Sequence, residues 1–180
     1  MALFPVINIF KHLKSRQKSY TVTPDKVWQD PLYFIAFGFG SGAIPVMPGT
    51  FGTLMAIPFY LLLRPLPLIY YVIFVLLFFA ASAWLCDYVS RATHTHDHPG
   101  MCIDEFAGFF VTMINAPEGT AWIILGFLLF RLFDIWKPWP IYLLDEKVHG
   151  GFGMVLDDIV AGVYALIVIQ IIAKMYNFPL

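Results

Sequence analysis

The chain of 180 residues has few charged side chains and few cysteines. Asp, Glu, Lys and Arg make up 13% of it, about half the share in a soluble domain, whereas 59% of the residues are hydrophobic. The formal net charge is −1, so no overall positive field exists to hold nucleic acid. Cys86 and Cys102 cannot build a disulfide framework. The composition therefore predicts an integral membrane protein and argues against a disordered chain or an ordinary cytosolic globule.

Several catalytic signatures are missing as well. The sequence has no Gly-x-Ser-x-Gly elbow, no Asp-x-Asp pair and no P-loop, and Cys86 to Arg91 is one residue short of the Cys-x5-Arg of cysteine phosphatases. His94, His96 and His98 alternate, but their spacing does not match the usual zinc patterns. We place His96 instead in a loop near the substrate.

Two hydrophobic runs are long enough to cross a bilayer as helices, residues 66–86 and residues 155–173. The runs 32–39, 54–63, 106–116 and 121–130 are shorter, which favours re-entrant or interfacial helices. We therefore expect an all-α, polytopic integral membrane helical bundle with a single membrane-embedded domain over residues 31–180. Residues 1–30 have the character of a basic arm without a signal-peptide cleavage site, which predicts a cytoplasmic N-terminus.

Turn-like breaks at residues 64–67 and 115–120 predict two hairpins, which pair run 54–63 with 66–86 and run 106–116 with 121–133. Each hairpin returns the chain to the side that it left. The polar segments 38–53, 87–105 and 131–158 are therefore expected on one face of the membrane.

Acidic residues concentrate in those polar segments and inside an apolar run. Carboxylates embedded in membrane helices are costly and usually mark a functional site with a positive partner. Hard oxygen ligands without a convergent Cys/His set favour Mg²⁺, and Arg131 and Lys137 can neutralise carboxylates or hold a phosphate. A competing interpretation makes the aspartates helix caps or interfacial ion pairs. The candidate metal ligands are Asp104, Glu105, Asp134, Asp157 and Asp158.

A Gly/Pro-rich loop over residues 38–53 is the other unusual feature. Its glycines would let backbone N–H groups approach a phosphate closely. Its spacing does not fit a dinucleotide fingerprint, and the loop could equally be a re-entrant bend. If it binds phosphate, Ser41, Gly49 and Thr50 are the candidate contacts.

Four segments together resemble the phosphatidylglycerophosphatase A family. They are Gly38-Phe-Gly-Ser-Gly with Pro48-Gly-Thr-Phe-Gly-Thr53, His96-Asp-His-Pro-Gly-Met-Cys-Ile-Asp-Glu-Phe-Ala-Gly108, Phe130-Arg-Leu-Phe-Asp-Ile-Trp-Lys-Pro-Trp-Pro140 and His149-Gly-Gly-Phe-Gly-Met-Val-Leu-Asp-Asp-Ile-Val-Ala-Gly162. The resemblance covers residues 32–165. The residues before Asp104 depart from the family pattern, at Met101-Cys102-Ile103.

The resemblance implies a Mg²⁺-dependent hydrolase of the bacterial inner membrane that converts phosphatidylglycerophosphate to phosphatidylglycerol and inorganic phosphate. Its substrate is a membrane lipid of the cytoplasmic leaflet, and its site residues would be the five carboxylates, Lys137 and the phosphate-binding candidates. Two alternatives stay open. A CDP-alcohol lipid phosphotransferase needs a motif that Asp157-Asp158 does not continue, and a divalent-cation transporter would place carboxylates along a pore at mid-membrane.

Overall fold

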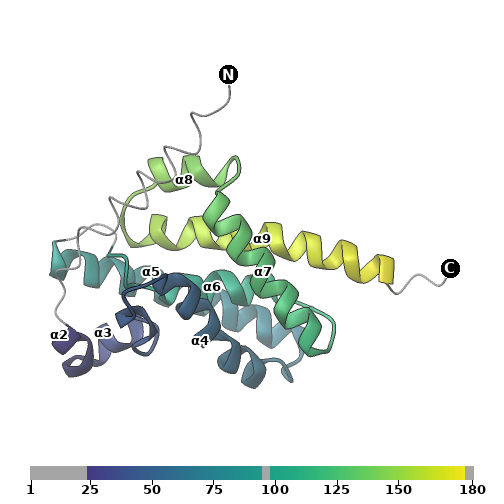
Figure 1. Cartoon of the computed structure of the whole chain (residues 1–180), viewed down its shortest axis with the longest axis horizontal. Helices are drawn as coiled ribbons and strands as arrows, with labels where there is room; N and C mark the ends of the chain where they lie inside the picture. The colour runs from purple at the N-terminus through teal and green to yellow at the C-terminus, as the bar shows by residue number, and fades with distance from the viewer. Residues whose placement is uncertain (1–23, 95–97, 177–180) are drawn as a thin grey trace.

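The computed structural model describes residues 24–94 and 98–176, and all the regular structure in them is helical. The elements are α2 (Pro24–Gln29), α3 (Pro31–Ala36), the 3-10 turn η1 (Ser41–Ala43), α4 (Pro48–Leu63), α5 (Leu68–Thr93), α6 (Ile103–Thr112), α7 (Thr120–Trp136), α8 (Ile141–Lys147) and α9 (Gly150–Tyr176). In Figure 1 α9, the longest described helix, runs beside α5, α6, α7 and α8, and its C-terminal part extends beyond them.

Helices α5 and α9 correspond to the two predicted spans. They have 26 and 27 residues, which gives each a length of about 40 Å, enough to cross a hydrocarbon core of about 30 Å. They are the two described helices that are long and apolar enough to cross a membrane, judged by length and composition. Their outward side chains are apolar too: Leu77 of α5 and Ile171 of α9 are exposed.

Helix α9 begins five residues earlier than the hydrophobic run predicted. Asp157 and Asp158 therefore lie two turns inside the helix, where neither can serve as its N-cap. Both side chains are buried. The helix-cap interpretation of this pair is wrong.

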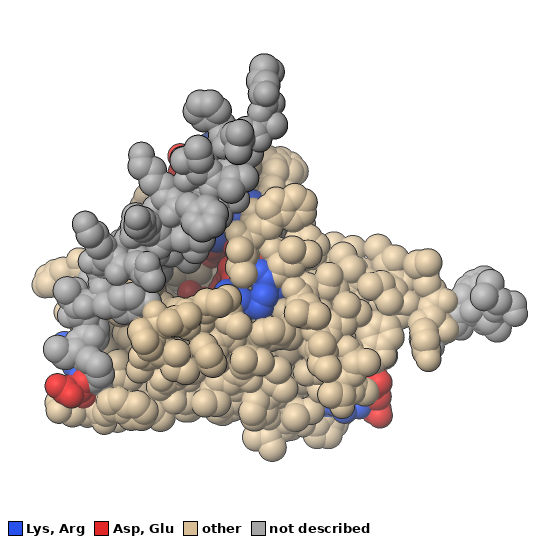
Figure 2. All heavy atoms as spheres, in the orientation of Figure 1, with Lys and Arg blue, Asp and Glu red and all other residues tan. Residues whose placement is uncertain are grey.

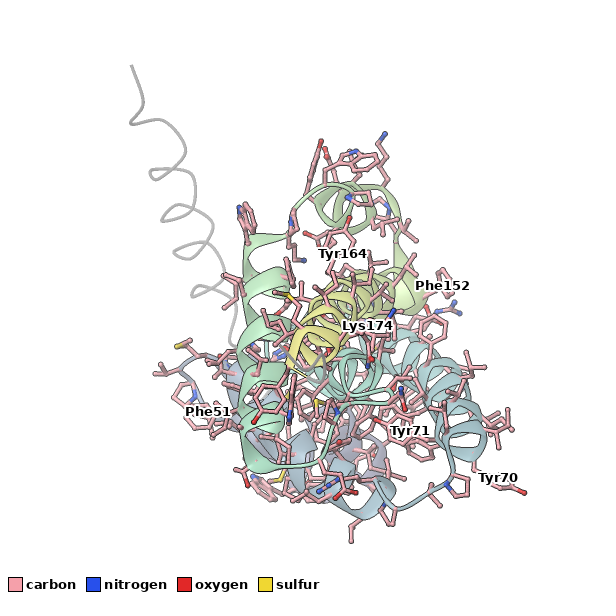
Figure 3. All side chains as sticks on the ribbon, turned by 90° about the vertical axis from the view of Figure 1, so that its right-hand side faces the viewer. Phe51, Tyr70, Tyr71, Phe152, Tyr164 and Lys174 are labelled. Carbon is pink, nitrogen blue, oxygen red and sulfur yellow. The ribbon has the colours of Figure 1, made fainter. Side chains whose placement is uncertain are left out.

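The short helix α6 occupies the centre of the bundle. It packs against α4, α5, α7 and α9, and its residues from Phe106 onward are all buried. With ten residues it is too short to cross a bilayer, as expected from the sequence. Close approach to α9 depends on Gly162, because a Cβ there would lie 2.4 Å from the Gly108 carbonyl oxygen. Tyr71 of α5 points inward and donates a hydrogen bond to the Phe110 carbonyl oxygen, whereas its neighbour Tyr70 points outward (Figure 3).

The two predicted hairpins are present, and their turns lie together. The turn between α4 and α5 meets the turn between α6 and α7 through an ion pair of 3.1 Å between Arg64 and Glu118. The beginnings of α4 and α6 and the end of α7 must therefore gather at the opposite end of the bundle. This arrangement confirms that the polar segments share one side of the molecule.

The Gly/Pro-rich segment is only partly a loop. Residues 37–47 contain the irregular backbone, with left-handed φ values at Gly38, Phe39, Gly40 and Met47. Residues 48–53, however, form the first turns of α4, because a proline in the first turn has no N–H that would need a helical partner. The basic arm lies mostly outside the described residues, but its final part, α2, packs on α3 and buries Val27.

Candidate active site

Three carboxylates converge at the end of the bundle where the polar segments meet. Asp104 and Glu105 lie in the first turn of α6, and Asp158 faces them from α9. One oxygen from each of the three lies within 4.8 Å of the others. Because α6 and α9 touch at Gly108 and Gly162, one turn further along, this spacing follows directly from the helix packing. We call these three residues the acidic triad.

The acidic triad fits a hard divalent cation. Its donors are all carboxylate oxygens, the type that Mg²⁺ and Ca²⁺ prefer. Glu105 Oε2 is buried and has no hydrogen-bond partner among the described residues, so an oxygen is available for a ligand. Burial raises the pKa of Glu105 to about 8, and the nearby Asp158 and Asp134 add to this, while Asp104 and Arg131 oppose it. A bound cation would offset both the burial and the repulsion from Asp158 and Asp134, and so favour the ionised form of Glu105.

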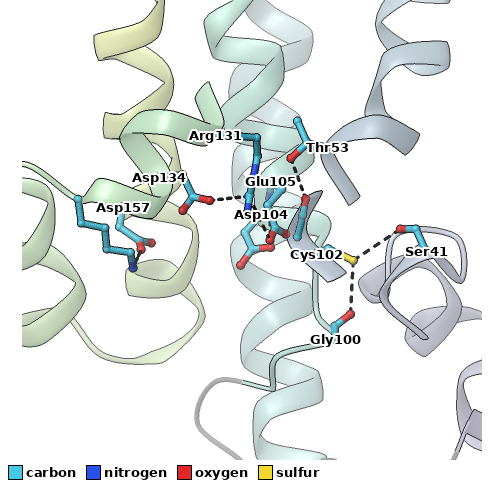
Figure 4. A network of polar contacts seen from close by, with 11 residues as sticks. Ser41, Thr53, Gly100, Cys102, Asp104, Glu105, Arg131, Asp134 and Asp157 are labelled. Carbon is cyan, nitrogen blue, oxygen red and sulfur yellow. Dashed lines mark hydrogen bonds and ion pairs between the residues drawn. The ribbon is translucent and has the colours of Figure 1, made fainter. Parts of the chain in front are cut away.

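Arg131, in the last turns of α7, lies beside the acidic triad (Figure 4). Its Nη1 donates to Asp134 Oδ2 at 2.5 Å and lies 3.9 Å from Glu105 Oε1. Its Nε is buried without a hydrogen-bond partner in the described part of the chain. The guanidinium therefore has a donor left for an anionic ligand next to the carboxylates.

Lys137 pairs with two carboxylates outside the acidic triad, Asp157 and Asp145. It follows α7 in a left-handed conformation, and its Nζ lies 2.6 Å from Asp157 Oδ2 and 2.8 Å from Asp145 Oδ1. Burial lowers the pKa of Lys137, but the two carboxylates outweigh this effect and raise it well above its ordinary value. Asp157 and Asp158 are thus neighbours with separate partners, since successive helix residues point about 100° apart.

The start of α4 closes the site on the other side. A Cβ at Gly49 would lie 2.1 Å from Glu105 Oε1 and 3.1 Å from Arg131 Nη1, so only glycine leaves room there. Thr53 donates to the Gly49 carbonyl oxygen at 2.8 Å. The Thr50 hydroxyl is buried with no partner among the residues that the structure describes. Gly49 therefore lies against Glu105 and Arg131, with Thr50 next to it in the chain, and their contact with a phosphate stays a prediction.

One predicted substrate contact, Ser41, does not join this group, and another, His96, cannot be placed. The Ser41 hydroxyl donates to the Gly38 carbonyl oxygen at 2.7 Å and lies 3.6 Å from Cys102 Sγ, so it supports the loop from behind (Figure 4). His96 lies outside the described residues. Its neighbour His98 is buried against the Phe37 ring and accepts a hydrogen bond from the Gly100 N–H.

Sequence reasoning missed Asp145 and Thr53. Asp145 is half-exposed on α8 and meets Lys137 only because α8 folds back onto α9. No spacing signal marks such a contact. Thr53 could have been found, because it lies four residues after Gly49 and can bond back to that carbonyl group once the segment is helical.

Figure 2 shows red and blue side chains gathered in a hollow at the centre of one face, while the uncovered surface around them is almost entirely uncharged. An acidic group that fits a divalent cation, with an arginine beside it, is suited to binding a phosphate ester. Its position at one end of apolar helices suits a substrate whose remaining part stays in the lipid.

Comparisons with known proteins agree with this chemistry. The family model described as Phosphatidylglycerophosphatase A matches residues 34–173. Phosphatidylglycerophosphatase A of Escherichia coli (strain K12) is 41% identical over 152 residues, which is 84% of this chain and 87% of that protein. The Haemophilus influenzae protein of the same name is 41% identical over 142 residues, 78% of this chain and 87% of its own.

A third relative, from Bacteroides thetaiotaomicron, is 35% identical over 145 residues, 76% of this chain and 90% of its own, and its name proposes a phosphatidylinositol-3-phosphatase. No solved structure is significantly similar to this chain. The family match covers all of the residues described above as the site, from Gly49 to Asp158. The chain belongs to the phosphatidylglycerophosphatase A family.

Proposed function

We propose that this protein is a Mg²⁺-dependent lipid phosphatase that hydrolyses phosphatidylglycerophosphate to phosphatidylglycerol and inorganic phosphate in phospholipid biosynthesis. The observation that carries the proposal is the acidic triad with Arg131 beside it, at one end of apolar helices. The names of the relatives supply the headgroup.

The cation would be held by Asp104, Glu105 and Asp158. When bound, Mg²⁺ supplies positive charge that offsets the phosphate and acidifies a nearby water molecule. Asp134 and Asp157, which the sequence also offered as candidate metal ligands, have other roles in this proposal. Asp134 orients Arg131, and Asp157 is held by Lys137.

Arg131 binds the phosphoryl oxygens through its unpartnered Nε and stabilises the charge that spreads over them during hydrolysis. The hydroxyl of Thr50 is a second donor for the same group, because it is buried without a partner among the described residues. Gly49 contributes by its lack of a side chain, which leaves the space between Glu105 and Arg131 open.

Asp157 is our candidate for the general base. Lys137 occupies its Oδ2, while its Oδ1 is buried and has no partner in the described part of the chain. Water attacks phosphorus as Asp157 Oδ1 takes its proton, and the bond from phosphorus to the glycerol oxygen breaks. The glycerol oxygen then takes up a proton and leaves as the alcohol, and inorganic phosphate is released. Lys137 is a positioning residue that holds Asp157 as a carboxylate.

We place the site at the cytoplasmic face of the bacterial inner membrane in a multi-pass chain. The basic residues of segment 1–26 support a cytoplasmic start. Charged groups collected at one end of the bundle are less suited to a transporter, whose carboxylates would follow a pore through the membrane. A phosphotransferase of the CDP-alcohol type stays less favoured because its motif is missing after Asp158.

Phosphate release from detergent-purified protein tests this proposal. Phosphatidylglycerophosphate, phosphatidic acid and phosphatidylinositol 3-phosphate would be compared, each with Mg²⁺ and with a chelator. We expect release that needs Mg²⁺ and is fastest from the first lipid, strongly reduced in Asp158→Asn and unchanged in the exposed control Glu146→Gln. No release from any of the lipids by folded protein would refute phosphatase activity, and faster release from the inositol lipid would refute the headgroup assignment.

A further inference from the structure

A second candidate site lies where α9 approaches its end. A hollow of about 440 Å³ runs between the turn after α6 and the last turns of α9, and an adjoining hollow of about 530 Å³ shares Asn115, Gln170 and Lys174 with it. Both volumes fall in the range of small-molecule sites, about 300–1,000 Å³. None of the residues that line either hollow belongs to the site described above.

This hollow is at the opposite end of the bundle from the acidic triad. Gln170 ties the end of α9 to the turn after α6, because its side-chain amide donates to the carbonyl oxygens of Ile114 and Asn115 at 3.1 and 3.0 Å. Asp158 and Lys174 are 16 residues apart on one helix, about 24 Å along its axis. A hydrocarbon core is about 30 Å thick, so Lys174 lies near the headgroup level of the other leaflet when the triad lies at its own. In Figure 3 Lys174 marks the near end of α9.

The lining combines an apolar wall with a cation. Ile114, Leu166, Ile167 and Ile171 form the wall, and Ile167 and Ile171 are about half exposed. Lys174 has no ion-pair partner among the described residues. Glu118 also lines the adjoining hollow, where it forms an ion pair of 3.1 Å with Arg64.

We propose that this hollow binds an anionic phospholipid from the leaflet opposite to the reaction. One acyl chain lies against the isoleucine wall, the phosphate meets Lys174, and the polar Asn115 faces the headgroup. An apolar wall beside a lysine favours an anionic phospholipid over other ligands. A soluble anion would make no apolar contact with the wall, and a neutral lipid would have no charge to pair with Lys174. The proposal depends on α9 crossing the membrane but not on the proposed phosphatase activity.

Native mass spectrometry of the detergent-purified full chain tests this site. Phosphatidylglycerol or phosphatidylcholine would be added at equal concentration to wild type, Lys174→Gln and the control Lys147→Gln, which removes an exposed lysine on α8. We expect Lys174→Gln to weaken phosphatidylglycerol binding about tenfold, the loss of one charge-assisted contact, and Lys147→Gln to leave it unchanged. Ile167→Ala should also weaken binding of phosphatidylglycerol, because it removes part of the apolar wall against which the acyl chain lies.

Equal phosphatidylglycerol binding by wild type and Lys174→Gln would overturn the proposal, as would equal retention of both lipids by wild type. Phosphate release provides the separate readout, because Lys174 is far from the acidic triad. Loss of lipid binding with unchanged phosphate release supports the second site, whereas a protein that binds the lipid and releases no phosphate contradicts only the proposed function.

Discussion

Gly49 is the position where one added methyl group should damage the site most selectively. The Cβ of Gly49→Ala would lie 2.1 Å from Glu105 Oε1, whereas ordinary contact begins near 3.4 Å. The Glu105 carboxylate must therefore move by about 1 Å, because the backbone fixes the position of the methyl group, which also lies 3.1 Å from Arg131 Nη1. Helix α4 itself has no reason to unfold, because alanine favours a helix more than glycine does.

The expected cost can be estimated from this displacement. Misplacing a catalytic group by about 1 Å costs about 100-fold in rate, equivalent to about 2.7 kcal/mol of transition-state stabilisation. Overpacking would lower the free energy of unfolding by about 1–3 kcal/mol. We therefore expect phosphate release by Gly49→Ala to fall about 100-fold at saturating lipid and to need more Mg²⁺, with the helical circular dichroism spectrum unchanged.

Gly126→Ala is the matched control. Its Cβ would approach Met113 Sδ to 2.5 Å, so it too must displace a side chain, but this side chain belongs to the packing of α7 near Ile169 and not to the site. That variant should lose some stability and keep its rate. A Gly49→Ala protein with wild-type rate and Mg²⁺ dependence would refute the placement of Glu105 and Arg131 in the reaction.

Three further predictions follow from other contacts. Arg131→Lys should reduce phosphate release about tenfold or more although the charge is kept, because lysine lacks the Nε donor; kinetics at saturating Mg²⁺ measure this. The apparent affinity for Mg²⁺ should rise about tenfold per pH unit below about pH 8 and then level off, since the cation must displace a proton from Glu105; calorimetric titrations on wild type and Glu105→Gln check this. Gly162→Val should lower the free energy of unfolding by about 1–3 kcal/mol or more, because its Cβ meets the Gly108 carbonyl oxygen; denaturant titration in detergent measures this.

The helices were predictable where hydrophobic runs are long. The runs 66–86 and 155–173 are about as long as a membrane-spanning helix needs to be, and α5 and α9 cover residues 68–86 and 155–173 of them. The start of α9 was not predictable, because Gly150, Gly151 and Gly153 argue against a helix by local propensity. Packing explains the difference: a Cβ at Gly151 would lie 2.1 Å from the Ala83 carbonyl oxygen, so glycine lets α9 touch α5.

The members of the site were predictable, but their partners were not. Charged residues within or next to apolar runs of the sequence predicted a site. Four of them lie together in the structure: Asp104, Glu105, Arg131 and Asp158. Asp157 and Asp158 look equivalent in the sequence. They point in different directions around α9, so Asp157 pairs with Lys137 and Asp158 belongs to the acidic triad. Such pairings depend on tertiary packing, which local spacing does not encode.

The central claim is tested most directly by measuring how a divalent cation binds to variants of the two adjacent aspartates, Asp157 and Asp158. Mn²⁺, a hard cation with a paramagnetic signal, would be titrated into wild type, Asp157→Asn and Asp158→Asn. We expect Asp158→Asn to weaken Mn²⁺ binding about 100-fold, since it removes one of three anionic ligands, and Asp157→Asn to retain binding close to that of wild type. Wild-type affinity in Asp158→Asn, or an equal loss in both variants, would contradict the assignment of the cation to Asp104, Glu105 and Asp158.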